Sequence, residues 1–242
     1  MICFPLKSIN SSLIYGTISI YTKFEFIFSK DDIKFLRDFA NQISNIIQIL
    51  EEKKELELIN KISTKINLEN EVEDIFKIAV NELPLITGFN GCSILKMISK
   101  NIFKIVASTQ TKLEGKEVAI KNKALKEIVK ILKEIVEEPR IEFFPDVQND
   151  NRLLDTQNLI INVKSMVWIP IFVEKDKFYG IIVLVTSTVK GKQDIKKLSN
   201  NSFNEYNRSI FNTLSNLIGT AIEKNELIYT TRLVLTIHLL AA

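Results

Sequence analysis

Histidine and cysteine, the side chains that most often carry catalysis or bind metals, are scarce in this 242-residue chain. His238 is its single histidine, and Cys3 and Cys92 are its two cysteines. Most zinc sites, haem ligation and Ser/His or Cys/His catalysis need more of these side chains. The composition therefore disfavours an enzyme. Two cysteines in so long a chain favour a reducing, cytoplasmic setting.

One short segment, FPDVQNDNR from Phe144 to Arg152, gathers polar residues that could bind a ligand or build a loop. Pro145 fixes a backbone dihedral at its start, and Asp146 is able to accept hydrogen bonds from nearby backbone amides. These roles make a turn, and ligand contact is the alternative. Arg152 is able to pair with an anionic ligand, or with Asp146 or Asp150 to hold the loop.

The overall composition predicts a packed core rather than disorder, with 46% hydrophobic and 25% charged residues in one or two domains. The net charge of +3 comes without a dense Lys/Arg run, so we expect no nucleic-acid partner. The apolar stretch 233–242 is about half a membrane span, and the first residues lack the features of a leader. We expect no membrane partner.

Two segments far apart in the chain share one pattern. CFPL at 3–6 is followed by YGTISI at 15–20, and WIPI at 168–171 is followed by YGIIVL at 179–184. Both copies read as strand, turn and strand, and the apolar residues of the following segments also correspond. The repeat predicts that 1–50 is the C-terminal part of a truncated domain and that a complete copy follows. A native N-terminal hairpin is the alternative.

A long helix should connect the two copies. Asp32 follows Ser29 by three residues, in the pattern of a capping box at a helix start. No Gly or Pro interrupts 31–67, so we expect one connecting helix of coiled-coil character over that range. Two helices broken near Glu52 are the alternative.

The rest of the chain alternates between helical and strand periodicity. We expect a helix at 69–83 ended by Pro84 and Gly88, and a helix at 123–138 stopped by Pro139. The remaining expected elements are strands at 90–98, 102–108, 141–144, 164–173 and 178–186, a polar loop at 145–162, an insertion at 189–201, and a final helix from 204 past 228. This order predicts an α+β fold, an antiparallel sheet flanked by helices, with long connecting helices.

The final helix carries an apolar seam that suits either its own sheet or a partner helix. Asn225 and Arg232 interrupt the seam, which consists of Leu214, Ile218, Ala221, Ile228, Leu235 and Leu239. We expect 229–242 to begin an output or coiled-coil helix.

The order of elements and three motifs resemble the GAF domain, a GAF/PAS-like module of signalling proteins. The motifs are the Pro-Asp-Val loop at 144–152, the strand 163–170 with its serine and proline, and the glycine-opened strand 179–184. The resemblance covers roughly 67–226, which places a complete GAF-like domain at 68–228, and it extends to the truncated copy near the start.

In such domains a ligand lies between one sheet face and the long loop. The resemblance therefore implies a pocket formed by Met97, Ile105, Phe143, Asp146, Arg152, Ser165, Val167 and Tyr179. Plain core packing is the alternative for Met97, Ile105 and Val167. Haem-binding relatives need histidine or a carboxylate and cysteine cluster, and Cys92 lies too early in its strand for bilin attachment. The cofactor is therefore unknown.

The resemblance implies the sensory or regulatory region of a cytoplasmic signal-transduction protein. Such a region would bind a small-molecule ligand or a partner and relay the change through its long helices to an output domain. We also expect a homodimer formed through the helices. The alternatives are a dimerisation scaffold that binds no ligand, and an enzyme like free methionine sulfoxide reductase, for which the domain has too few cysteines.

Overall fold

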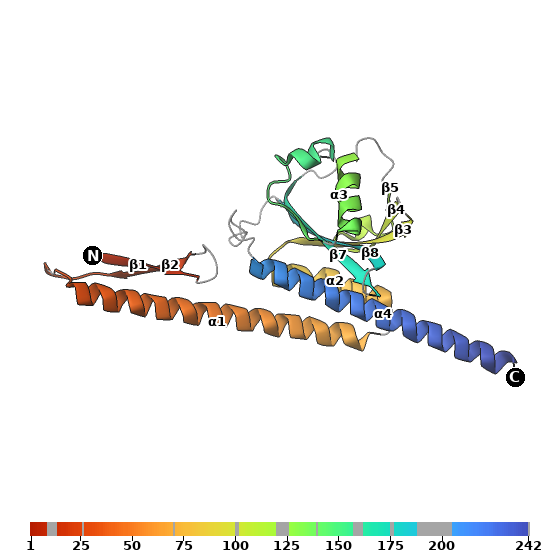
Figure 1. Cartoon of the computed structure of the whole chain (residues 1–242), viewed down its shortest axis with the longest axis horizontal. Helices are drawn as coiled ribbons and strands as arrows, with labels where there is room; N and C mark the ends of the chain where they lie inside the picture. The colour runs from red at the N-terminus through yellow and green to blue at the C-terminus, as the bar shows by residue number, and fades with distance from the viewer. Residues whose placement is uncertain are drawn as a thin grey trace. The chain divides into compact units, whose positions relative to one another are not determined.

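The computed structural model describes residues 1–8, 14–25, 27–69, 71–99, 102–119, 126–138, 140–156, 162–174, 177–187 and 205–241. The chain divides into two compact units, one built on Met1–Leu58 and the other on Ile59–Lys197 with Glu205–Ala242. Helix α1 (Lys30–Leu68) contributes residues to both units (Figure 1). No helix among the described residues combines the length and apolar character that crossing a membrane requires.

The first unit is a hairpin packed on a helix. Strands β1 (Ile2–Lys7) and β2 (Ile14–Ile20) pair antiparallel, as the sequence predicts. Phe4 and Leu6 from the hairpin and Ala40 from α1 are the buried residues of its small core. Ile33, Leu36, Ile43 and Ile47 of α1 pack against it and, together with Ala40, recur at spacings of three and four.

The predicted capping box at the start of α1 is confirmed. The Ser29 backbone N–H donates to the Asp32 carboxylate at 2.9 Å, and the Asp32 N–H donates to Ser29 Oγ at 3.1 Å. The Ser29 hydroxyl donates to the Asp32 carboxylate at 2.7 Å, and this bond, together with that from the Ser29 backbone N–H, lowers the pKa of Asp32. The helix then runs without interruption for 39 residues, so the prediction of a single helix is confirmed and a break near Glu52 is wrong.

The second unit is a six-stranded antiparallel sheet flanked by helices, which confirms the predicted fold class. The strand order is β5-β4-β3-β8-β7-β6. The strands are β3 (Gly91–Ser99), β4 (Ile102–Ser108), β5 (Glu117–Ala119), β6 (Glu142–Phe144), β7 (Val163–Val173) and β8 (Lys177–Ser187).

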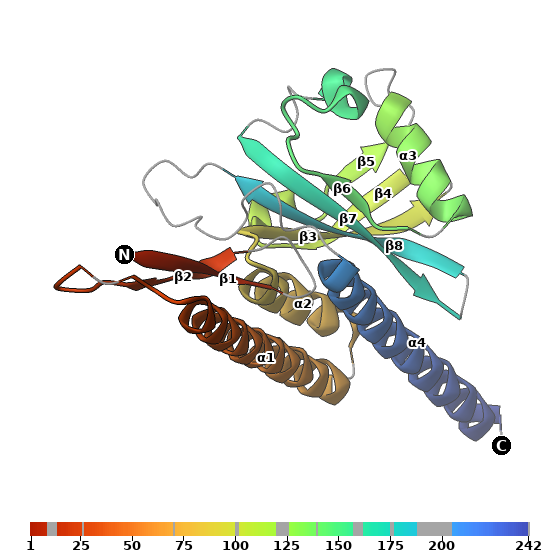
Figure 2. The ribbon, with the colours of Figure 1, turned by 60° about the vertical axis from the view of Figure 1, so that its left-hand side comes forward.

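Helices cover both faces of this sheet. Helices α2 (Val72–Thr87) and α4 (Glu205–Ala241) lie on one face (Figures 1 and 2). Helix α3 (Lys126–Glu137) and the short helix η3 (Asn151–Thr156) lie on the other. Helix α4 approaches β7 closely, because Ser215 Oγ donates to the Pro170 carbonyl and a Cβ on Gly219 would lie 2.2 Å from the Phe172 carbonyl oxygen.

Several boundaries differ from the sequence-based expectation. Pro84 does not end α2, which continues to Thr87. A proline removes one backbone donor, and later N–H groups can still bond along the helix. The helix ends at Gly88, whose left-handed φ of 76° lets its N–H donate to the Pro84 carbonyl at 2.9 Å. Strand β5 and the short helices η1 (Thr111–Leu113) and η3 were not predicted. Pro139, residues 123–125 and the insertion at 189–201 lie outside the described residues.

The repeated motif adopts one register in both units. In β1–β2, Pro5 pairs with Thr17 and Leu6 pairs with Gly16. In β7–β8, Pro170 pairs with Ile181 and Ile171 pairs with Gly180. In each hairpin, the residue after the proline lies opposite the glycine that follows tyrosine.

The two glycines of this motif have different surroundings. A Cβ on Gly180 would lie 2.2 Å from the Leu95 carbonyl oxygen, because β3 runs beside β8. A Cβ on Gly16 would meet nothing within 4 Å in the part of the chain that the structure describes. Strand β3 thus requires glycine at position 180, whereas no described atom would contact a side chain at position 16.

We expect Gly180→Ala to lower the free energy of unfolding by about 1–3 kcal/mol, because the backbone of Leu95 must move. Gly16→Ala is the matched control and should change it by no more than about 0.5 kcal/mol. Urea unfolding followed by circular dichroism and by the fluorescence of Trp168, the single tryptophan, measures both effects. Equal losses for the two variants would contradict the assigned role of the β3 contact.

Candidate functional site

The sheet face under α3 carries an apolar cluster, here called the α3-face cluster. Helix α3 contributes Ile131, Leu132 and Ile135, whose spacing places all three on one side of the helix. They pack with buried residues from four strands and from the loop after β6. The complete buried set is Phe103, Ile131, Leu132, Ile135, Phe144, Val147, Leu153, Met166, Trp168, Phe178 and Ile181.

Trp168 places an unsatisfied donor inside this cluster. Its side chain is 5% exposed, and its ring centroid lies 5.2 Å from that of Phe144. Its Nε1 has no hydrogen-bond partner among the described residues. Burying such a group unpaired costs about 1–3 kcal/mol. The indole N–H can only donate, so it suits a ligand atom that accepts a hydrogen bond.

The loop 145–156 covers one side of the cluster. Its Val147 N–H donates to the Lys164 carbonyl at 2.8 Å, which fixes the loop to the start of β7. The Val147 and Leu153 side chains are fully buried. Asp146 acts locally, because its carboxylate accepts from Asn149 Nδ2 at 2.7 Å. The donor is the side-chain amide of Asn149, rather than the backbone amides expected from the sequence.

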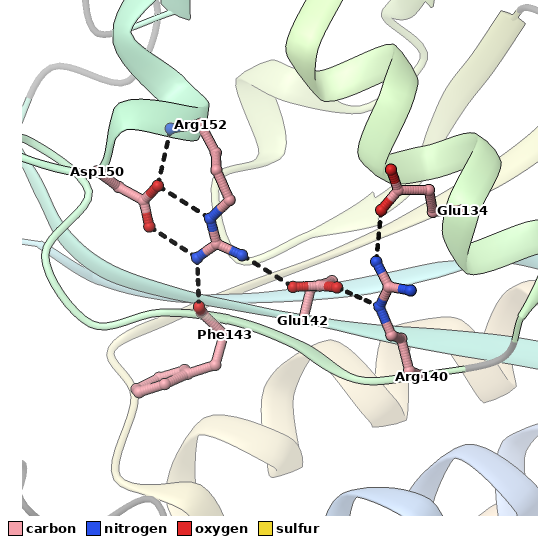
Figure 3. Close-up of polar contacts among 6 residues, drawn as sticks. All are labelled: Glu134, Arg140, Glu142, Phe143, Asp150 and Arg152. Carbon is pink, nitrogen blue, oxygen red and sulfur yellow. Dashed lines mark hydrogen bonds and ion pairs between the residues drawn. The ribbon is translucent and has the colours of Figure 1, made fainter.

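Arg152 ties this loop to strand β6 (Figure 3). Its Nη2 contacts the Asp150 carboxylate at 2.7 Å and the Phe143 carbonyl oxygen at 2.9 Å, and its Nη1 contacts Glu142 at 3.0 Å. The guanidinium carbon lies 4.5 Å from the Phe144 ring centroid. Arg152 therefore holds the loop through Asp150, one of the two carboxylates expected from the sequence.

A second arginine extends the network to α3. Arg140 donates from Nε to Glu142 and from Nη2 to Glu134 of α3 (Figure 3). Hydrogen bonds to Glu142 and Glu134 raise the pKa of Arg140. Glu142 thus bridges two guanidinium groups and links the loop, β6 and α3. No sequence motif indicated Arg140, Glu142 or Glu134.

The sheet separates the eight expected pocket residues. Met97 packs against the α3-face cluster, and Asp146 and Arg152 lie in the loop 145–156. These three residues share the α3 side. Ile105 pairs with Leu95 but lines a groove together with Lys96, Lys104 and Tyr179.

The other four residues lie elsewhere. Phe143 pairs with Val167, so by strand alternation both point away from the neighbouring Phe144 and Trp168. Ser165 Oγ contacts the Thr186 hydroxyl, and the Tyr179 ring lies 6.1 Å from that of Phe76 in α2. The sequence prediction missed Phe144, Met166 and Trp168, which the same alternation could have identified.

The two cysteines differ in exposure. Cys3 is exposed, and Cys92 is buried on β3. Burial raises the pKa of the Cys92 thiol, so this thiol is not a reactive nucleophile.

Residues 71–222 match the family model of the GAF domain, and the chain belongs to the GAF domain family. Among solved structures, the phycocyanobilin-bound GAF domain of a cyanobacterial phytochrome has a TM-score of 0.56 at 18% identity. That match covers 72% of this chain and 96% of the other. The GAF domain of an Acinetobacter phosphoenolpyruvate-protein phosphotransferase has a TM-score of 0.54 at 15% identity, covering 73% and 98%.

A methyl-accepting chemotaxis protein is also similar, with a TM-score of 0.53 at 17% identity, covering 69% of this chain and 98% of the other. At these sequence identities, the similarity shows a shared fold only. No curated protein matches the chain. The second unit is therefore a GAF domain.

We predict that Arg152→Met raises the pKa of Asp150. In the wild type, the hydrogen bond from Arg152 lowers this pKa below its ordinary value of about 3.9. A lowered folded-state pKa stabilises the fold above the unfolded-state pKa, and this stabilisation is lost as the pH falls through the folded-state value. Titration of the Asp150 carboxyl carbon by NMR measures the shift. Lys112→Met, a surface substitution, should leave it unchanged, and an unchanged value in Arg152→Met would refute the assignment.

Proposed function

We propose that 68–228 is the ligand-binding sensory domain of a cytoplasmic signal-transduction protein. Its ligand would be a mostly apolar small molecule, bound between the α3-face cluster and the loop 145–156. The observation that carries this proposal is the buried, unpaired Trp168 Nε1 among apolar side chains. Apolar walls with few convergent polar groups are typical of small-molecule sites. The phycocyanobilin of the phytochrome neighbour is one small molecule held by such a domain.

The ion-pair network holds the loop 145–156 on the sheet. Arg152 and Glu142 form this contact, and their side chains are 44% and 12% exposed. Because Glu142 is largely buried and the loop residues Val147 and Leu153 are fully buried, contacts with the ligand would have to compensate for any movement of the loop. Met97, Asp146 and Arg152 are the expected site residues that this proposal retains.

Strand β7 offers a route from the ligand to helix α4. Trp168 faces the cluster, while the Pro170 carbonyl accepts from Ser215 of α4. A shift of β7 therefore changes the surface on which α4 packs. Such a relay requires the ligand to bind two arrangements of the helix with different affinity. Residues 229–242 would begin the output or coiled-coil helix, and catalysis would belong to another domain.

The first unit fits the C-terminal part of a second GAF-like domain, truncated to 1–50. The shared register of β1–β2 and β7–β8 supports this proposal. Gly16 has the same position in its hairpin as Gly180 has in the second unit. A neighbouring strand crowds Gly180, whereas no described atom lies within 4 Å of a Cβ on Gly16. Residues 31–67 would then connect two related domains.

Ligand binding on the α3 side should be visible through Trp168, the single tryptophan of the chain. We expect a member of a panel of cyclic nucleotides, purines and tetrapyrroles to raise the melting temperature and change Trp168 fluorescence. Trp168→Phe should weaken that ligand about tenfold by removing the N–H donor. Because the smaller phenyl ring also leaves a cavity, the unliganded variant should melt somewhat lower, and its ligand affinity is measured by the ligand-induced rise in melting temperature. If no compound moves either signal, the α3-face site is wrong.

The alternative function, a dimerisation scaffold, rests on a specific face of α1. Large apolar side chains on this face are 47–69% exposed and recur with heptad spacing: Phe35, Phe39, Ile46, Ile49 and Leu56. The hairpin covers a different face, which carries Leu36 and Ile43. A second copy of the chain would pack its own seam against this one, so that both seams are buried. This seam supports a homodimer formed through the helices, whether or not a ligand binds.

We expect the full chain to be dimeric and the double variant Ile46→Glu/Ile49→Glu to be monomeric, because charge in a coiled-coil seam prevents its burial. Sedimentation equilibrium measures the mass. Leu85→Glu changes an equally exposed leucine on α2 outside the seam and should leave the dimer intact. A wild-type monomer at all concentrations would exclude both the dimer and the scaffold function.

A further inference from the structure

A groove of about 970 Å³ lies on the sheet face opposite the α3-face cluster. It is bounded by the first turn of α2, the middle of α4, and strands β3 and β4. None of the α3-face cluster residues lines it. It is therefore a separate candidate site, here called the charged groove.

Two buried oxygen atoms at the charged groove form no close hydrogen bond with the described residues. They are Tyr179 Oη and Asn225 Oδ1, and their side chains are 7% and 5% exposed. Burial raises the pKa of the Tyr179 hydroxyl, and the nearby Lys96 ammonium opposes this rise. Asn225 Nδ2 donates to the Ala221 carbonyl at 3.0 Å, which fixes the orientation of the amide. Asn225 therefore presents an acceptor, whereas Tyr179 can donate or accept.

Charges of both signs line the charged groove on different elements. Lys96 and Lys104 come from the sheet, and Lys96 Nζ lies 4.7 Å from the Tyr179 ring centroid. The helices contribute Glu71, Glu73, Glu226 and Arg232. In the described part of the chain none of these six groups forms an ion pair within 4 Å. Three cations face three carboxylates, so their formal charges cancel.

This combination favours a zwitterion over an ion of one sign. A polyanion such as a nucleotide would meet the three carboxylates, and a polyamine would meet the three cations. An acceptor at Asn225 Oδ1 favours a ligand with N–H groups. Phe76, Ile98 and Ile228 add apolar lining for a hydrocarbon side chain.

We propose that the charged groove binds an apolar α-amino acid. Its ammonium group would donate to Asn225 Oδ1 beside Glu226, and its carboxylate would accept from Lys96 Nζ and Tyr179 Oη. Such a ligand would contact the sheet and α4 together. This site is independent of the function proposed above, which concerns the opposite face of the sheet.

The probe is L-leucine, added to the full chain at up to about 10 mM and followed by calorimetry and thermal shift, which detect millimolar dissociation constants. We expect L-leucine to bind and to raise the melting temperature. Three analogues should bind at least about tenfold more weakly because each lacks one interaction. These are 4-methylpentanoate without the ammonium, 3-methylbutylamine without the carboxylate, and N,N,N-trimethyl-leucine without N–H.

Variants test the assigned residues. Tyr179→Phe and Lys96→Met should each weaken L-leucine about tenfold. Tyr179→Phe should not lower the melting temperature of the free protein, since the lost hydroxyl forms no close hydrogen bond with the described residues. Tyr15→Phe and Lys112→Met, matched changes outside the charged groove, should bind as wild type does.

Trp168→Phe separates the two proposals. It should weaken an α3-face ligand about tenfold and leave the affinity for L-leucine unchanged, because Trp168 does not line the charged groove. Absence of L-leucine binding, wild-type affinity in Tyr179→Phe and Lys96→Met, or equal binding of the three analogues would each overturn the amino-acid site. None of these results would affect the α3-face proposal.

Discussion

The second unit depends on a central pair of strands, β7 and β8, that is buried on both faces. Ile169 and Ile171 of β7 are fully buried, and the adjacent Trp168 is 5% exposed. A strand with apolar side chains on both sides exposes too much apolar surface unless both faces are covered. Helices α2 and α4 cover one face, and α3 with the loop 145–156 covers the other. The domain therefore has two sides, which can differ in chemistry.

Periodicity and end signals were sufficient to predict most elements. The Ser29 and Asp32 capping pair, the long uninterrupted α1 and the strand at 102–108 all follow from local rules. Strand β5 has three residues, too few for a periodic signal, and it exists because β4 offers a free edge for pairing. Pro84 was wrongly predicted to end α2. A proline removes only its own backbone donor, and the N–H groups after it can still form helical hydrogen bonds.

The candidate site was harder to predict than the fold, because side-chain direction depends on register. Tyr179 is an extra residue between the pairs Ile171–Gly180 and Phe172–Phe178, and this bulge places it on the α2 side. Nothing in the sequence marks that bulge. The Arg140–Glu142–Arg152 network is likewise built from residues far apart in sequence, and only the fold brings them together.

The different surroundings of the two thiols have a practical consequence. Cys92 is sealed within the domain, while Cys3 lies on the exposed edge of the hairpin beside the Ser19 hydroxyl. A maleimide dye or nitroxide added to the native protein would therefore attach at one position, without any engineered substitution. That single tag reports on the hairpin and leaves the GAF domain chemically untouched.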